Sequence, residues 1–145
     1  MSIATIYPDV VLAEVLNDNV IVKTSKTKSH TIKAFPANKQ PNKDLPKEYL
    51  SVYQNGITES LTKPIGLYRG NLALAIFVET QSDGTAKTQI IRQIIEQCEA
   101  IVNCKAYSGF YYEFDPANVI TPTTTNISTG YSTTILNVEW RTTHG

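Results

Sequence analysis

The feature that most constrains this fold is a strand-like segment, residues 72–79, that is apolar on both of its sides. Successive side chains of a strand point to opposite faces of the sheet. One face of this segment carries the large side chains of Leu72, Leu74, Ile76 and Val78. The other face carries the flatter set Ala73, Ala75 and Phe77. A strand with one face in water would alternate apolar and polar residues, so both faces of this one require cover.

An amphipathic helix over residues 86–102 is predicted directly after this strand. Its apolar stripe recurs at helical spacing and contains Ile90, Ile91, Ile94, Ile95, Cys98, Ile101 and Val102. The short polar link at residues 82–85 reads as a turn and lets the helix fold back onto the first face of the strand. The second face needs another cover. We expect a short opening helix to supply part of it and a neighbouring subunit to supply the rest.

The first half of the chain contains shorter elements. Residues 8–16 predict the opening helix, with a proline in its first turn. Residues 20–35 predict a β-hairpin around a polar tip, and the three prolines of residues 36–48 predict an extended loop. Asn55-Gly56 predicts a two-residue turn between strands, and the Tyr-Arg-Gly-Asn segment at residues 68–71 reads as another turn.

The last third of the chain predicts two further strands, at residues 109–115 and 133–141, which should pair antiparallel. The threonine-rich residues 119–131 between them predict a long hairpin tip or loop, because Pro122 and Gly130 would interrupt a strand.

This order of elements indicates an α+β fold in a single domain over residues 1–145. We expect a mainly antiparallel sheet with the long helix, about residues 86–102, packed on one face, together with the short N-terminal helix and a protruding β-hairpin. A chain of 145 residues is long enough to bury about two-thirds of the surface of its unfolded form.

The net charge of the chain also argues against some classes of function. Thirteen basic and thirteen acidic residues give a formal net charge of zero. Neutrality argues against a dedicated nucleic-acid binder and removes the repulsion that opposes self-association. The chain shows no signal-peptide pattern and no apolar run long enough for a membrane span, so we expect an intracellular protein with both cysteines reduced.

The sequence predicts neither an enzyme nor a cofactor or metal site. His30 lies among lysines with no acid nearby in the sequence, so it is interpreted as a solvated hairpin residue. Cys98 and Cys104 have no histidine at metal-ligand spacing. Glu113 and Asp115 are interpreted as solvated carboxylates of one strand face rather than an acid–base pair.

The charges are nevertheless distributed unevenly along the chain. The region from residue 20 to residue 47 is basic and contains Lys23, Lys26, Lys28, Lys33, Lys39, Lys43 and Lys47. The region from residue 79 to residue 115 is mainly acidic and contains Glu79, Asp83, Glu96, Glu99, Glu113 and Asp115. These regions could be two ordinary solvated surfaces, or they could match each other between neighbouring subunits, since head-to-tail contacts can close into rings. A third alternative is non-specific contact of the lysines with DNA phosphates.

The second half of the chain consists of an apolar strand, a turn and a helix over residues 67–102, then "GFYYEFD", a long polar segment and the closing "STTILNVEWRTT". This pattern resembles the tail-terminator proteins of long-tailed bacteriophages and related ring proteins of the head–tail neck. The resemblance lies in the order and character of the elements from about residue 8 to residue 142. It implies a virion structural protein, assembled in the host cytoplasm, that forms a homo-oligomeric ring of six or more copies. Its partners would be neighbouring connector and tail proteins, with no membrane and at most non-specific contact with DNA in the lumen.

The charge pattern, the second strand face and this resemblance together give a candidate interface. The residues expected at the subunit or ring interface are Lys23, Lys26, Lys28, Lys33, Ala73, Ala75, Phe77, Glu96 and Glu99. The residues expected in docking loops are Lys39, Lys43, Lys47, Thr123, Thr124 and Thr125. The alternative function is a small ligand- or carbohydrate-binding β module, in which Tyr107, Tyr111 and Tyr112 would form a stacking platform.

Overall fold

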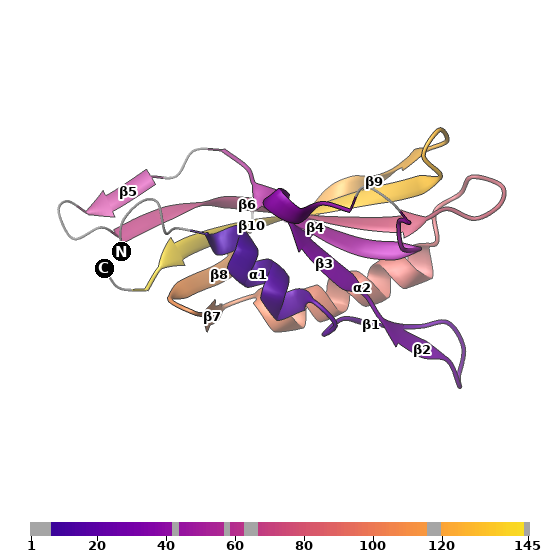
Figure 1. The fold of residues 1–145 in the computed structure, drawn as a ribbon, viewed down its shortest axis with the longest axis horizontal. Helices are drawn as coiled ribbons and strands as arrows, with labels where there is room; N and C mark the ends of the chain where they lie inside the picture. Colours follow the sequence, from indigo (N-terminus) through magenta and orange to yellow (C-terminus); the bar gives the residue numbers. More distant parts are fainter. Residues whose placement is uncertain (1–6, 42–43, 57–58, 63–66, 116–119, 144–145) are drawn as a thin grey trace.

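The structure of the chain is a computed structural model that describes residues 7–41, 44–56, 59–62, 67–115 and 120–143. It is an α+β fold with a mainly antiparallel sheet, as predicted (Figure 1). Its helices are α1 (Pro8–Leu16) and α2 (Thr88–Val102), with one turn of 3-10 helix, η2 (Ala37–Lys39). Its strands are β1 (Ile21–Lys23), β2 (Ser29–Thr31), β3 (Lys33–Pro36), β4 (Glu48–Gln54), β5 (Glu59–Thr62), β6 (Leu67–Glu79), β7 (Lys105–Tyr107), β8 (Phe110–Phe114), β9 (Ile120–Asn126) and β10 (Tyr131–Thr142).

The main sheet is built around β6 and β10, which pair antiparallel from Tyr131 opposite Glu79 to Arg141 opposite Arg69. The strand order is β3-β4-β6-β10-β8-β7, with β5 added to β6 and β9 added to β10. One pair, β3 with β4, is parallel. Strands β1 and β2 form a separate two-stranded sheet, which is the predicted hairpin.

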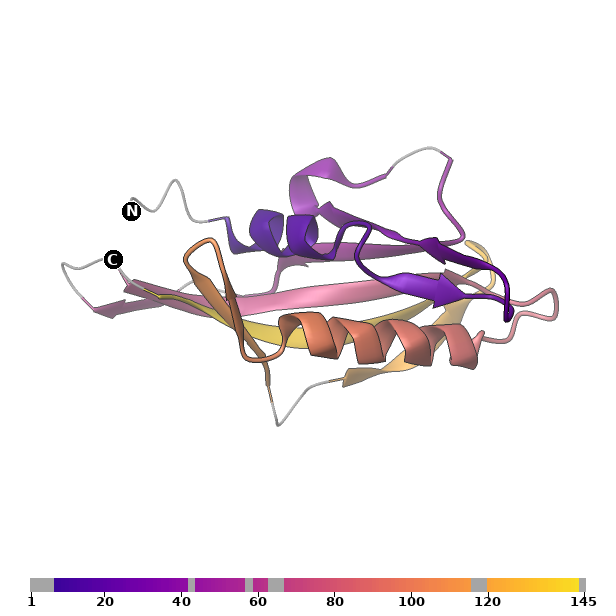
Figure 2. The same cartoon turned by 90° about the horizontal axis from the view of Figure 1, so that it is seen from below.

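Both α-helices cover the same face of the sheet. Leu12 and Leu16 of α1 belong to the same buried cluster as Ile94 of α2 and Leu74 of β6. Figure 2 shows the two helices and the β1–β2 hairpin in front of the strands. The expectation that α1 covers the opposite face, the one with Ala73, is therefore wrong. Helix α1 buries its apolar stripe beside α2 because the apolar surface of β3 and β4 extends the same core in that direction.

The strand β6 is longer than predicted at its N-terminal end, and Arg69-Gly70 lies inside it rather than in a turn. Gly70 is placed opposite Trp140, whose ring is buried. A Cβ atom on Gly70 would lie 2.8 Å from Trp140 Nε1, which is closer than real Cβ contacts. The glycine therefore makes room for the indole ring, and it does not mark a chain reversal.

Asn55-Gly56 does not form the predicted hairpin turn. Strands β4 and β5 both pair antiparallel with β6, the first with residues 72–78 and the second with residues 67–69. They follow each other in the same direction along one side of β6, because β10 occupies the other side. The Asn55 amide continues the pairing by donating to the Asn71 carbonyl at 2.9 Å.

The threonine-rich segment is more regular than predicted, because β9 pairs with β10 from Ile120 to Asn126. Pro122 is accommodated at a register shift between Thr133 and Ile135 of the partner strand. An edge strand tolerates proline at such an irregularity because its outer side makes no ladder bonds.

Candidate subunit interface

The sheet face opposite the helices contains the predicted interface residues Ala73, Ala75 and Phe77. Ala73 and Ala75 are only 2% and 1% exposed within a single chain. Their cross-strand neighbours include the larger side chains of Tyr53 and Ile135, so the two alanines lie at the bottom of a shallow layer. A neighbouring subunit would therefore contact the larger residues around them. The expectation that this whole face lacks cover in one chain is wrong for the alanines, whereas Phe77 remains half-buried.

One end of this face carries a cluster of aromatic rings. Tyr49 and Phe77 stack with ring centroids 4.7 Å apart, and Phe35 and Tyr131 meet the Tyr49 ring edge-on. The Tyr131 hydroxyl donates to the Pro46 carbonyl, which ties the proline-rich loop to this cluster. Burial raises the pKa of the Tyr49 hydroxyl, as well as that of Tyr131. The loop and the rings therefore protect this end from water.

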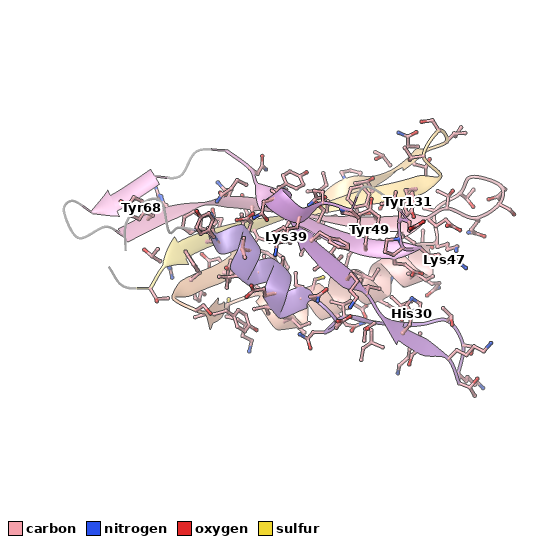
Figure 3. The ribbon with its side chains drawn as sticks, viewed as in Figure 1. His30, Lys39, Lys47, Tyr49, Tyr68 and Tyr131 are labelled. Carbon is pink, nitrogen blue, oxygen red and sulfur yellow. The ribbon has the colours of Figure 1, made fainter. Side chains whose placement is uncertain are left out.

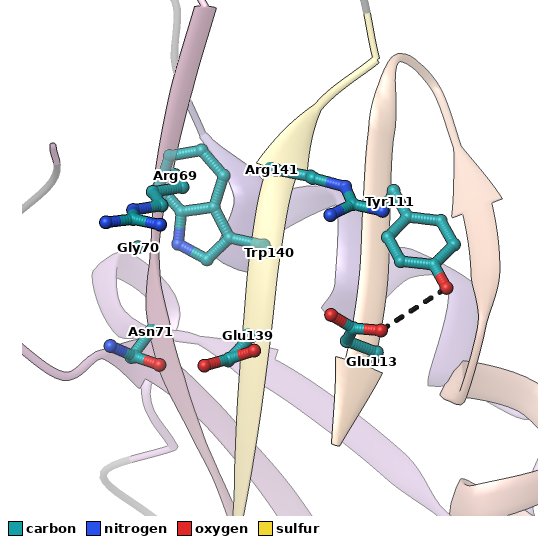
Figure 4. Close-up of a pocket in the computed structure, with 8 residues that line it drawn as sticks. All are labelled: Arg69, Gly70, Asn71, Tyr111, Glu113, Glu139, Trp140 and Arg141. Atoms are coloured by element: carbon teal, nitrogen blue, oxygen red, sulfur yellow. Dashed lines mark hydrogen bonds between the residues drawn. The ribbon is translucent and has the colours of Figure 1, made fainter. Parts of the chain in front are cut away.

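The other end of the same face is a charged groove, with a volume of about 360 Å³ (Figure 4). We use this name for the hollow lined by Arg69, Gly70, Asn71, Tyr111, Glu113, Glu139, Trp140 and Arg141. Strand pairing places Arg141 directly opposite Arg69, and Glu139 directly opposite Glu113. Like charges that face each other across strands cost up to about 1 kcal/mol.

Two interactions hold side chains of the charged groove in place. The Arg141 guanidinium lies over the Tyr111 ring, 4.5 Å from its centroid. The Tyr111 hydroxyl lies 3.4 Å from a Glu113 carboxylate oxygen, to which it donates. A hydrogen bond with the Cys104 thiol is the main cause that raises the pKa of Tyr111 to about 12, followed by partial desolvation.

The hairpin β1–β2 is attached to α2 by two glutamine side chains that act as a substitute strand. Gln97 accepts from the Ile21 amide and donates to the Ile21 carbonyl. Gln93 does the same with Lys23, at 2.9 and 3.2 Å. Gln93 and Gln97 are four residues apart and therefore lie on one side of the helix. Ile21 and Lys23 are two residues apart, so their backbone groups lie on one side of the strand at a similar spacing.

The hairpin presents Lys23, Lys26 and Lys28, three of the predicted interface residues, to solvent in the single chain. Lys33 differs, because its Nζ donates to Asp18 Oδ2 at 2.7 Å and this lysine already has an acidic partner within the chain. Glu96 and Glu99 are exposed on the outward side of α2. The hairpin lysines and these glutamates are all exposed, which permits a contact between two copies.

His30 is not the purely solvated residue that the sequence predicts. Its Nε2 lies 2.9 Å from Glu48 Oε2, and the Glu48 side chain is buried while the imidazole is half exposed. Glu48 begins β4, eighteen residues after His30, so sequence proximity could not indicate the pair. The contact ties β2 to β4 of the main sheet.

The predicted docking residues that the structure describes are exposed but do not form one patch. Figure 3 shows Lys47 at the end of the sheet near Tyr131, whereas Lys39 lies nearer the middle of the molecule. The exposed Thr123, Thr124 and Thr125 belong to β9. Lys43 lies outside the described residues.

The tyrosine platform of the alternative function does not form. Tyr112 is fully buried on the helix-covered face and donates to the Pro8 carbonyl at 2.8 Å. Tyr111, the next residue, points to the opposite face and into the charged groove. The Tyr107 hydroxyl donates a hydrogen bond to the Ile101 carbonyl. Of these three tyrosines, Tyr111 alone faces the charged groove.

Within the described ranges, no three histidine, cysteine or acidic side chains come together as a group that could hold a metal ion. Both cysteines are free, with Cys98 buried and Cys104 exposed. No helix in the part of the chain that the structure describes has the length and apolar character to cross a membrane.

No protein-family model matches this chain, and no curated protein matches it significantly.

Proposed function

We propose that this chain is a virion structural protein that forms a homo-oligomeric ring in the neck or at the tail terminus of a bacteriophage. In this proposal the protein joins the head or connector to the tail through its shape, and it catalyses no reaction. It would be assembled in the host cytoplasm and would contact connector and tail proteins above and below the ring.

The observation that carries the proposal is the β1–β2 arm. It is a separate two-stranded sheet that projects beyond the main sheet (Figure 1). The bonds of Gln93 and Gln97 hold it at a set position on α2. A rigid arm with exposed lysines suits a reach to the next copy, where the outward glutamates of α2 offer opposite charge. Such a head-to-tail contact repeats from copy to copy and closes if the rotation allows.

The test is the assembly state of the purified protein, measured by light scattering and negative-stain imaging. We expect rings of defined stoichiometry for the unmodified chain and loss of rings for Lys26→Glu/Lys28→Glu. Adding Glu96→Lys and Glu99→Lys to that variant should restore them, because the charges are exchanged across the same contact. Lys39→Glu/Lys105→Glu is the matched control, since both lysines are exposed and the pair changes the net charge equally on η2 and β7, outside the arm.

A strict monomer at high concentration would contradict the proposal. Rings that persist in Lys26→Glu/Lys28→Glu would show that the arm does not form the contact.

A further inference from the structure

The strand β9 forms an open edge of the main sheet. It pairs with β10 on one side, and no strand in the described part of the chain pairs with its other side. Figure 1 shows β9 along the margin of the molecule, with neither helix beyond it. Residues 122–126 are all exposed. The outer backbone groups of this strand are therefore accessible to a further strand.

This edge lacks the charged side chains that usually discourage pairing. No charged residue lies between Asp115 and Glu139 in the sequence. Open edges in natural proteins commonly carry lysines or other charges for this purpose. Three consecutive threonines, residues 123–125, instead favour the extended backbone of a strand. Of residues 122–126, Pro122 alone opposes pairing, because it has no N–H to donate.

The hydrogen bonds of the neighbouring strands determine how the backbone of β9 is oriented. The Glu79 amide donates toward the β4 side of β6, so the preceding Val78 directs its backbone groups to Ser132 of β10. Backbone groups of successive residues in a strand point to opposite sides. The next residue of β10, Thr133, therefore faces β9 and bonds to Thr124.

The same alternation turns the backbone groups of Thr123 and Thr125 outward, because those of Thr124 are used within the sheet. Thr123 keeps this register beside the irregularity of β9. Its hydroxyl lies 2.6 Å from the hydroxyl of Thr134, the residue that follows Thr133 on the partner strand. Two outward-facing residues at a spacing of two are what an added antiparallel strand requires.

We infer that β9 pairs antiparallel with β9 of a second copy of this chain, about a two-fold axis through Thr124 and perpendicular to the sheet. Thr123 of each copy then lies opposite Thr125 of the other, and each pair exchanges both of its backbone hydrogen bonds. Pro122 lies opposite Asn126 of the second copy at a non-hydrogen-bonded position, where its missing N–H is not needed. The strand is thus complementary to itself in this register.

Other strands of a second copy match this edge less well. The edge strand β7 is three residues long and contains Lys105, and β5 contains Glu59. In the two-fold arrangement both strands are free of charge, and threonines meet threonines across the axis, a pairing that stabilises sheets. The second copy's β10 and β6 lie beyond its β9, so the two sheets join into one continuous sheet.

This contact goes beyond the proposed ring function, because β9 belongs neither to the arm nor to α2. It gives the exposed threonines of β9 an occupant and does not require the ring to form. If both contacts form, the β9 edges join copies of two different rings. The two contacts can be tested separately because they share no residue.

The test uses the ring-defective Lys26→Glu/Lys28→Glu protein as the parent, so that the arm does not contribute to association. We expect this parent to dimerise reversibly in sedimentation equilibrium. Hydrogen exchange at the Thr123 and Thr125 amides should slow as the protein concentration rises, because these amides become bonded in the dimer. A parent that stays monomeric, or a dimer with unchanged exchange at both amides, would overturn the inference.

Three variants of the parent test the register. Thr125→Pro removes an outward N–H without removing a bond to β10, so the dimer should weaken about tenfold or more, since each copy loses one hydrogen bond. Thr123→Lys/Thr125→Lys should also weaken it, because like charges then lie directly opposite each other. Thr123→Glu/Thr125→Lys should dimerise at least as strongly as the parent, because opposite charges then meet.

The matched control is Ser82→Lys/Gln89→Lys, which adds the same charge at exposed positions outside β9 and should leave the dimer unchanged. Thermal melting of each variant verifies that it is folded. Weakened variants that instead dimerise as the parent does, or a Thr123→Glu/Thr125→Lys protein that stays monomeric, would overturn the inference. An unmodified chain that dimerises through β9 but forms no rings would reject only the proposed ring.

Discussion

Gly70 shows how a single residue can determine the packing of a central strand. Its backbone lies against the buried indole of Trp140, whose Nε1 has no hydrogen-bond partner among the described atoms. A methyl group at this position would force the ring or the strand to move. The glycine is therefore a packing requirement of the β6–β10 pair, although its dipeptide context suggests a turn.

We expect Gly70→Ala to lower the free energy of unfolding by about 1–3 kcal/mol, because the added Cβ overlaps a ring that cannot shift within a packed core. Urea denaturation measures the change. In a Trp140→Phe background, which lacks Nε1 and the fused ring carbons, the cost of the same substitution should be smaller. An equal cost in both backgrounds would show that the clash with the indole is not its cause.

Asp18 carries a pH-dependent contribution to stability. Its carboxylate accepts from Lys33 Nζ and from Thr31 Oγ1, and the hydrogen bond from Lys33 is the main cause that lowers the Asp18 pKa below its ordinary value of 3.8. A carboxyl whose folded pKa is lowered stabilises the fold above its unfolded pKa and loses this effect as the pH falls through its folded pKa.

We expect Asp18→Asn to be less stable than the unmodified chain at neutral pH and equally stable below the folded pKa of Asp18. Asparagine accepts the left-handed backbone at this position, φ 62°, so the substitution isolates the charge. Thermal melting from pH 7 to pH 2 measures the difference. Asp44→Asn, at another left-handed and exposed position, is the control, and a gap that persists at pH 2 would contradict the explanation.

At the scale of elements, the position of the β1–β2 arm depends on a helix rather than on the main sheet. The outer backbone groups of β1 bond to amide side chains of Gln93 and Gln97, which takes the place of a further strand. This arrangement blocks an edge that would otherwise be open to non-specific pairing.

Gln97→Ala should therefore release one end of the arm while leaving the core intact. We expect faster hydrogen exchange at the Ile21 amide and a loss of about 1 kcal/mol in unfolding free energy, the usual net value of a hydrogen bond. Gln89→Ala, an exposed glutamine of the same helix, should change neither quantity. Unchanged exchange at Ile21 in Gln97→Ala would mean that the glutamine does not hold the arm.

At the scale of the whole molecule, the two faces of the main sheet differ in character. The helix-covered face contains nearly all the large buried side chains, whereas the opposite face divides into an aromatic end and a charged end. The proposed ring contact depends on charges rather than on apolar area.

We therefore expect self-association to weaken as salt rises, because the screening length falls from about 10 Å at 0.1 M to about 3 Å at 1 M. Sedimentation velocity across this range measures the assembled fraction. The melting temperature of the ring-defective Lys26→Glu/Lys28→Glu variant is the control for the fold itself. Association that strengthens with salt would indicate an apolar contact through Phe77 and its neighbours instead.

Several features of this protein could be read from the sequence because they depend on local periodicity. The spacing of Ile91, Ile94 and Cys98 predicts α2, and the double apolar alternation of residues 72–79 predicts a central strand; both are confirmed. The hairpin arm with its exposed lysines and the α+β class follow in the same way. Local patterns define elements because each element must present a continuous apolar surface.

Other features were decided only by tertiary structure, since they depend on how distant segments align. The face that α1 covers, the pairing of His30 with Glu48 and the room that Gly70 makes for Trp140 join residues far apart in the chain. The charged groove likewise exists because the register of β10 with β6 and β8 brings like charges opposite each other. Strand register is set by the packing of the whole sheet, so no single segment of sequence contains it.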